Sequence, residues 1–282
     1  MSDLLSGLSS MGLQNLEGLD LFETQKKPEQ QDKKEETPLV QEKDMIYDRN
    51  YECPVCDTRF TSKTVKAGKS KLVHTDQDLR PVYDGIDIVK YDVIVCPHCG
   101  HAALTRYFKP LPSVQAKLIK ENISANFKMQ FEKGETTSYP EAFKLYQLAL
   151  ANAIVKKAHA SEKAYICLKT GWLLRGWQET LKEDIPEQAA QKKDLAQQED
   201  KYLANALEGF VNAVQTENFP ICGMDETTVD YLMAVLSMRF KKYDVASKLI
   251  GNILTSNIAS PRMKDKTRDL KEQVLQELKN NK

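Results

Sequence analysis

Cys53-Pro54-Val55-Cys56 and Cys96-Pro97-His98-Cys99-Gly100 are the two stretches of sequence that decide the fold. Each holds two thiols separated by two residues, a spacing at which one tight turn directs both sulfur atoms to a single point. The proline in each stretch stiffens its turn, and Gly100 lets the chain leave the second turn with backbone amides close to sulfur. Four converging thiolates form a tetrahedral set that Zn²⁺ prefers, so the pattern predicts a zinc site. The predicted ligands are Cys53, Cys56, Cys96 and Cys99.

Other chemistries of paired cysteines fit the sequence less well. Iron in a rubredoxin-like site uses similar turns, but the 39 residues between Cys56 and Cys96 are long for that compact domain. A redox dithiol needs one pair beside a βαβ pattern and leaves the second pair without a role. Disulfides are disfavoured, because the sequence shows no secretory signal and we expect reducing surroundings.

The predicted metal site is structural, with no catalytic residue. A catalytic zinc keeps an open position for water, whereas four cysteines close the coordination shell. We expect His98 to face solvent, and His101 to be a surface residue or a hydrogen-bond donor behind the ligands. The chain also has no glycine-rich phosphate loop and no Gly-x-Ser-x-Gly or His-Glu-x-x-His motif, so we expect a protein that is not an enzyme.

Composition narrows the class of partner. Apolar residues make up 41% of the 282, enough for a substantial core. The chain carries 40 basic and 40 acidic residues, and residues 53–110 carry nine and six, which argues against bulk attraction to nucleic acid. No run approaches 18 apolar residues, so we expect no membrane span and a cytoplasmic protein.

The chain divides into four predicted segments. Residues 1–22 are leucine-rich with spacings of three and four, which predicts a short segment that docks on the protein's own body or, alternatively, binds a partner. Residues 23–44 are polar and predict a disordered linker. Residues 45–112 hold the cysteines and two predicted strands, at 60–65 and 86–95. Residues 113–282 predict a helical domain.

Seven helices joined by short turns are predicted in the last segment, which implies an antiparallel stack. Their starts are marked by capping residues or by first-turn prolines such as Pro140 and Pro186. The predicted ranges are 113–132, 141–157, 161–182, 186–214, 225–240, 244–256 and 261–279.

A pattern of a small residue, a bulky residue four positions on and a small or aliphatic residue three further recurs in these helices. It is similar to the second helix of a tetratricopeptide unit, although the intervals of 64 and 40 residues differ from the regular 34. We therefore predict an irregular tetratricopeptide-like stack with an insertion around 183–200. An ordinary helical bundle is the alternative. The three copies are Ala142/Tyr146/Ala149, Ala206/Phe210/Ala213 and Ala246/Ile250/Ile253.

Three longer motifs resemble the bacterial domain-of-unknown-function family 2225 over roughly residues 45–260. They are Tyr51-x-Cys53-Pro54-x-Cys56, Asp78-Leu79-Arg80-Pro81-x-Tyr83-x-Gly85-Ile86-Asp87 and Lys90-Tyr91-Asp92-Val93-x-Val95-Cys96-Pro97-x-Cys99-Gly100. The resemblance implies a cysteine metal site and a tetratricopeptide-like C-terminal half, and it implies no activity.

The polar and aromatic residues of the middle motifs suggest how the two halves meet. We predict that they pack the β module against the helices through an Arg–carboxylate pair, with a ligand site as the alternative. These residues are Asp78, Arg80, Tyr83, Asp87, Lys90 and Tyr91.

The sequence thus predicts an α+β fold, mainly α, in which a small four-cysteine, zinc-ribbon-like β module precedes a tetratricopeptide-like antiparallel helical stack. The expected function is that of a non-enzymatic interaction or scaffold protein, with a structural Zn²⁺ and helical repeats that bind a protein or peptide. The alternative is a nucleic-acid-associated regulator that uses the zinc ribbon.

Overall fold

The structure, a computed structural model, describes residues 41–128, 131 and 134–280. The leucine-rich segment 1–22 and residues 23–40 of the predicted linker lie outside these residues. The described chain begins with a turn of 3-10 helix at Glu42–Met45.

Within the residues that the structure describes, three antiparallel strand pairs make up the β part. Strand β1 (Ile46–Glu52) pairs with β2 (Arg59–Val65) so that Ile46 lies opposite Val65 and Glu52 opposite Arg59. Strand β3 (Leu72–Thr75) pairs with β4 (Pro81–Tyr83), and β5 (Val93–Val95) with β6 (Ala102–Leu104). Each pair is its own two-stranded sheet, so none has a broad face of its own to bury.

The strand predicted at 86–95 is wrong over its first half. Ile88–Tyr91 form a turn of 3-10 helix, and only Val93–Val95 are extended. The cause is local, because the Asp87 carboxylate accepts a hydrogen bond from the backbone N–H of Val89 at 3.0 Å and caps the turn. The strand predicted at 60–65 is confirmed as β2.

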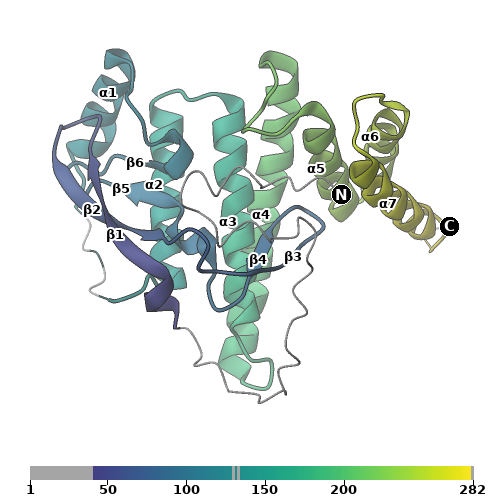
Figure 1. The fold of residues 1–282 in the computed structure, drawn as a ribbon, viewed down its shortest axis with the longest axis horizontal. Helices are drawn as coiled ribbons and strands as arrows, with labels where there is room; N and C mark the ends of the chain where they lie inside the picture. Colours follow the sequence, from purple (N-terminus) through teal and green to yellow (C-terminus); the bar gives the residue numbers. More distant parts are fainter. Residues whose placement is uncertain (1–40, 129–130, 132–133, 281–282) are drawn as a thin grey trace, which may run out of the picture. The chain divides into compact units, whose positions relative to one another are not determined.

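In the described part of the chain seven α-helices follow the strands, and consecutive helices from α2 to α7 contact one another (Figure 1). The first-turn prolines Pro140 and Pro186 are confirmed in α2 and α4, and the predicted cap Asp225 accepts a hydrogen bond from the N–H of Thr228 in α5. Ser138 caps α2 as well, accepting from the N–H of Glu141. The helices are α1 (Ser113–Ile119), α2 (Tyr139–Val155), α3 (Ala160–Glu179), α4 (Pro186–Thr216), α5 (Glu226–Arg239), α6 (Tyr243–Thr255) and α7 (Pro261–Asn280).

The first helix is shorter than the range 113–132 predicted. It widens into a π-helical turn at Lys120–Ser124 and then leaves helical geometry. Phe127 packs so closely on Gly100 that a Cβ built there would lie 2.4 Å from its ring. The end of this helical segment thus lies beside the second cysteine turn.

One hydrophobic core joins the β part to the helices. Val93, Val95 and Leu104 of β5 and β6 belong to the same buried cluster as the core residues of α2, α3 and α4, and Figure 1 shows this strand pair beside α2. A second cluster lies between α5, α6 and α7. The nine positions of the recurring small–bulky–small pattern are all buried, so the pattern marks core faces of α2, α4 and α6.

The fold class is the predicted one, α+β with helices predominating. None of the helices in the described ranges combines the length and the apolar character needed to cross a membrane.

Candidate metal centre and helical groove

The two cysteine stretches form two matching turns at the tips of hairpins. The first joins β1 to β2 and the second joins β5 to β6. In each, the N–H of the leading cysteine donates to the carbonyl five residues later, from Cys53 to Thr58 at 3.0 Å and from Cys96 to His101 at 2.8 Å. In each, the residue four after the leading cysteine is left-handed, with φ of 58° at Asp57 and 72° at Gly100. The two loops are therefore equivalent in backbone conformation, and their sulfur atoms point toward each other.

The four sulfur atoms gather at one point, as the sequence indicates. All four Sγ atoms lie within 4.8 Å of one another, with Cys53 and Cys99 at 3.5 Å and Cys56 and Cys96 at 3.6 Å. Sulfurs at about 2.3 Å from a tetrahedral ion stand about 3.8 Å apart, whereas a disulfide needs about 2.0 Å. The donor set therefore fits one tetrahedral metal ion bound by four cysteines.

The surroundings of the sulfurs favour thiolate at one of them. The pKa of Cys53 falls to about 5, chiefly because Cys99 donates a hydrogen bond to it, with help from the backbone N–H groups of Val55 and Cys56. The same contact raises the pKa of Cys99, and burial raises that of Cys96 to about 11. These hydrogen bonds therefore favour a negative charge on the sulfur of Cys53.

The thiol group is enclosed by apolar side chains. Val55 and Ile119 of α1 pack against the cysteines, and Cys53 and Cys96 are fully buried. Among the described residues this metal-ligating group consists of the four thiols alone. Sets of four cysteines without a further ligand are typical of structural metal centres.

The two neighbouring histidines differ. His98 is exposed, as expected. His101 is fully buried, so of the two alternatives expected for it the surface position is wrong. Its Nδ1 lies 3.2 Å from Oδ1 of Asn152 on α2, and Asn152 also donates to the carbonyl of Gly100 at 3.1 Å. Burial lowers the pKa of His101 to about 4. A neutral histidine and one amide thus fasten the second cysteine turn to α2.

The predicted Arg–carboxylate contact between the β part and the helices is present. Arg80 in the β3–β4 hairpin donates from Nε to Asp76 at 2.7 Å and from Nη1 to Glu179 of α3 at 3.1 Å. The Arg80 side chain is only 6% exposed, whereas that of Glu179 is 54% exposed, so this contact is shielded from water on the arginine side alone. Two further residues of these motifs also have partners. Asp87 accepts a hydrogen bond from the Tyr139 hydroxyl of α2 at 3.0 Å, and Lys90 forms an ion pair with Glu42 at 2.6 Å.

A second arginine, which the sequence did not single out, carries more of this contact. Arg175 of α3 donates to Asp76 at 3.0 Å, to Asp78 at 3.0 and 2.6 Å, and to Glu199 of α4 at 2.9 Å. Burial by itself would lower the pKa of Arg175, but the carboxylates of Asp78 and Glu199 outweigh burial and raise the pKa above its usual value. Nothing in the local pattern of α3 distinguishes Arg175 from a surface arginine.

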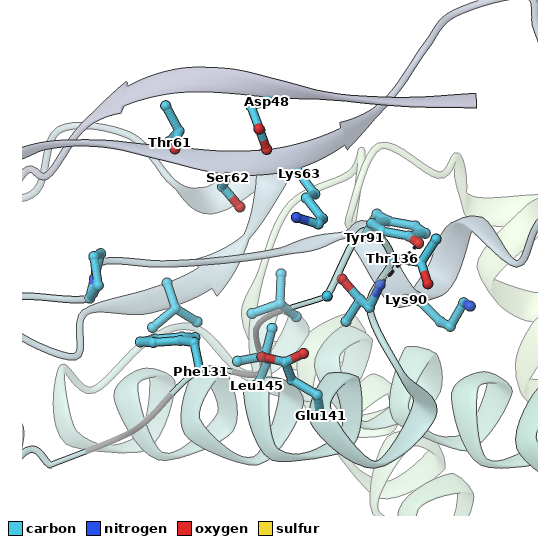
Figure 2. A pocket seen from close by; sticks show the side chains of 15 residues that line it. Asp48, Thr61, Ser62, Lys63, Lys90, Tyr91, Phe131, Thr136, Glu141 and Leu145 are labelled. Atoms are coloured by element: carbon cyan, nitrogen blue, oxygen red, sulfur yellow. Dashed lines mark hydrogen bonds between the residues drawn. The ribbon is translucent and has the colours of Figure 1, made fainter. Parts of the chain in front are cut away.

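A polar cavity of about 310 Å³ lies between the β1–β2 ribbon and α2 (Figure 2). Figure 2 shows Lys63 of β2 and Glu141 of α2 reaching toward this space from opposite walls. Tyr91 also lines the cavity and accepts a hydrogen bond from the N–H of Thr137 at 3.2 Å. The lining mixes both signs of charge, and its described residues include no paired nucleophile and base.

A larger groove of about 650 Å³ lies between α2, α3 and α4. Phe143, Leu150 and Ile154 of α2 and Tyr202 of α4 give it an apolar lining, and Ile154 is 58% exposed. Phe143 and Tyr202 meet edge to face with centroids 6.0 Å apart, which fixes the spacing of the two walls. The sequence did not indicate this groove, because it depends on how three helices align.

Comparison with families of known proteins gives a match over most of the chain. The sequence model of the family described as "Uncharacterized protein conserved in bacteria (DUF2225)" matches residues 46–274. No curated protein and no solved structure matches the chain.

Proposed function

The chain belongs to the DUF2225 family of bacterial proteins, and we propose that it is a non-enzymatic interaction protein of the cytoplasm, in which a structural Zn²⁺ ion holds the β part and the helices bind a protein or peptide. The observation that carries the proposal is the apolar groove between α2, α3 and α4. Exposed apolar side chains gathered in a concavity are typical of surfaces that bind partners.

Zinc is the proposed metal because of the ligand set. Four thiolates select Zn²⁺ or iron among common cellular metals, and Zn²⁺ is the usual occupant of closed four-cysteine sites built from two such turns. The ion would be held by Cys53, Cys56, Cys96 and Cys99 and would supply cohesion rather than chemistry. A two-stranded hairpin is marginal by itself, so metal binding would contribute directly to the folding of this part.

The proposal is tested by quantitative affinity enrichment from cells that encode the protein. Wild-type chain is compared with Ile154→Glu, which places a charge in the groove, and with Ile258→Glu, which alters an exposed isoleucine elsewhere. We expect a partner that the wild type and Ile258→Glu enrich equally and that Ile154→Glu loses. Equal recovery by all three chains would place partner binding outside the groove and contradict the proposal.

The metal assignment has its own measurement. Elemental analysis of purified full-length protein should find one zinc per chain. Iron, or no metal in a folded chain, would contradict it.

A further inference from the structure

We infer that the groove between α2, α3 and α4 accepts an acidic amphipathic helix of about three turns; this rests on the proposed function and specifies its partner. The groove presents an apolar lining with lysines on two of its three helices, Lys163 on α3 and Lys201 on α4. The shape, the apolar row and the charges each limit what fits there.

The length of the groove limits the length of its occupant. Phe143 and Ile154 line the groove from opposite ends of its α2 wall. At a rise of about 1.5 Å per residue, the eleven steps between them span about 16 Å, the length of about three helical turns. A helix laid along this wall presents apolar residues at i, i+7 and i+11 to Phe143, Leu150 and Ile154.

The packing of the walls favours a helix over a strand. Two helices, α2 and α4, flank the groove, and buried Cys167 of α3 lines it as well. The faces of packed helices offer ridges and grooves to another helix, whereas a strand needs an open sheet edge with unpaired backbone groups. Helix walls satisfy their own backbone groups and offer no such edge.

The lysines set the sign of the occupant's charge. Nearby Lys156 and Lys192 are paired with Glu162 at 2.7 Å and Glu183 at 2.6 Å. By contrast, neither Lys163 nor Lys201 forms an ion pair with a carboxylate in the part of the chain that the structure describes. The lining also contains Asp194, which accepts from Gln198 at 2.7 Å, so the groove keeps an excess of one positive charge. Carboxylates on the polar flank of the helix complement it.

The test uses two synthetic peptides of about 12 residues with the same leucines at i, i+7 and i+11. One carries glutamates at the flanking positions and the other lysines. Binding to full-length zinc-loaded protein is measured by fluorescence anisotropy at low and high salt. We expect the acidic peptide to bind on the order of tenfold more tightly than the basic one, with the difference shrinking in high salt.

Variants of the chain make the test specific to the groove. Ile154→Glu should weaken binding of the acidic peptide by at least about tenfold, and Ile258→Glu should leave its affinity unchanged. The double variant Lys163→Glu/Lys201→Glu should reverse the preference in favour of the basic peptide. Thermal melting and zinc content of each variant exclude loss of folding as the cause.

Two results would overturn the inference: equal binding of the two peptides, or binding that persists in Ile154→Glu. Failure of the inference remains distinct from failure of the proposed function. If the acidic peptide does not bind but the enriched cellular partner still depends on Ile154, only the class of partner is wrong. If that enrichment is also insensitive to Ile154→Glu, the proposed function fails as well.

Discussion

Replacing Arg175 by alanine should destabilise the protein by about 3 kcal/mol. The guanidinium donates four hydrogen bonds to Asp76, Asp78 and Glu199, and the side chains of Asp78 and Glu199 are only 5% and 4% exposed. Removing one partner of a buried ion pair costs about 3–5 kcal/mol, because the other charge is left in the interior. We take the lower end, since Arg175 itself is 21% exposed and water can reach the space it leaves.

Most of this loss of stability should come from one carboxylate, that of Asp78. Asp76 keeps Arg80 at 2.7 Å, and Glu199 keeps Arg239 at 3.0 Å. Asp78 keeps no other ion pair within the described residues. Asp78→Asn removes the stranded charge, so in the Arg175→Ala background it should restore about 1–2 kcal/mol.

Urea denaturation at pH 7.5, followed by far-UV circular dichroism, measures both effects. Arg268→Ala is the matched control, because Arg268 pairs with Asp265 on the exposed face of α7 and should cost less than about 0.5 kcal/mol. A cost for Arg175→Ala no larger than that of the control would refute the reasoning. So would a double variant with Asp78→Asn that is less stable than Arg175→Ala alone.

Three further predictions concern the metal, charge burial and backbone space. Cys53→Ser should lose its zinc and melt on the order of 10 °C lower, while Cys167→Ser keeps its zinc by elemental analysis. Burial and the nearby Glu226 raise the pKa of Asp230 to about 6, above its ordinary value of 3.8, so its charge costs stability above pH 6 and protonation relieves that cost below. Asp230→Asn should therefore stabilise by about 1 kcal/mol at pH 8, after allowance for solvent screening, and the gain in urea titrations should vanish as the pH falls toward 4. Gly176→Ala should lower the free energy of unfolding by about 1–3 kcal/mol, because its Cβ would lie 2.4 Å from the Asp87 carboxylate. The control Gly251→Ala, on the open surface of α6, should raise it by up to about 1 kcal/mol in the same urea assay. Equal effects of the two substitutions would count against this packing.

The parts of the fold that could be predicted from the sequence are those determined by a few neighbouring residues. The cysteine turns are local, and helix starts such as those marked by Pro140 and Asp225 depend on one side chain and the next turn. The run 86–95 shows the limit, because its β-branched residues favour a strand while the Asp87 side chain caps a helical turn. In this run the capping hydrogen bond outweighs the β-strand propensity of the side chains.

The contacts that sequence could not predict depend on registers between distant elements. Arg80 could be assigned a carboxylate partner, but Glu179 could not be chosen from the many acidic residues of the helices. The groove is a further case, since Ile154 is an ordinary helical residue until α4 places Tyr202 across from Phe143. Burial of His101 likewise depends on Asn152, 51 residues along the chain.

The separation between the β part and the helices in sequence has a consequence for synthesis on the ribosome. Arg80 meets Glu179 across 99 residues, so the β part leaves the ribosome well before the helix it packs against. At about 5–20 residues per second, that delay is roughly 5–20 s. During it the four thiols belong to hairpins without a supporting core, and early capture of a metal ion would protect them from oxidation and hold the two turns together until α3 arrives.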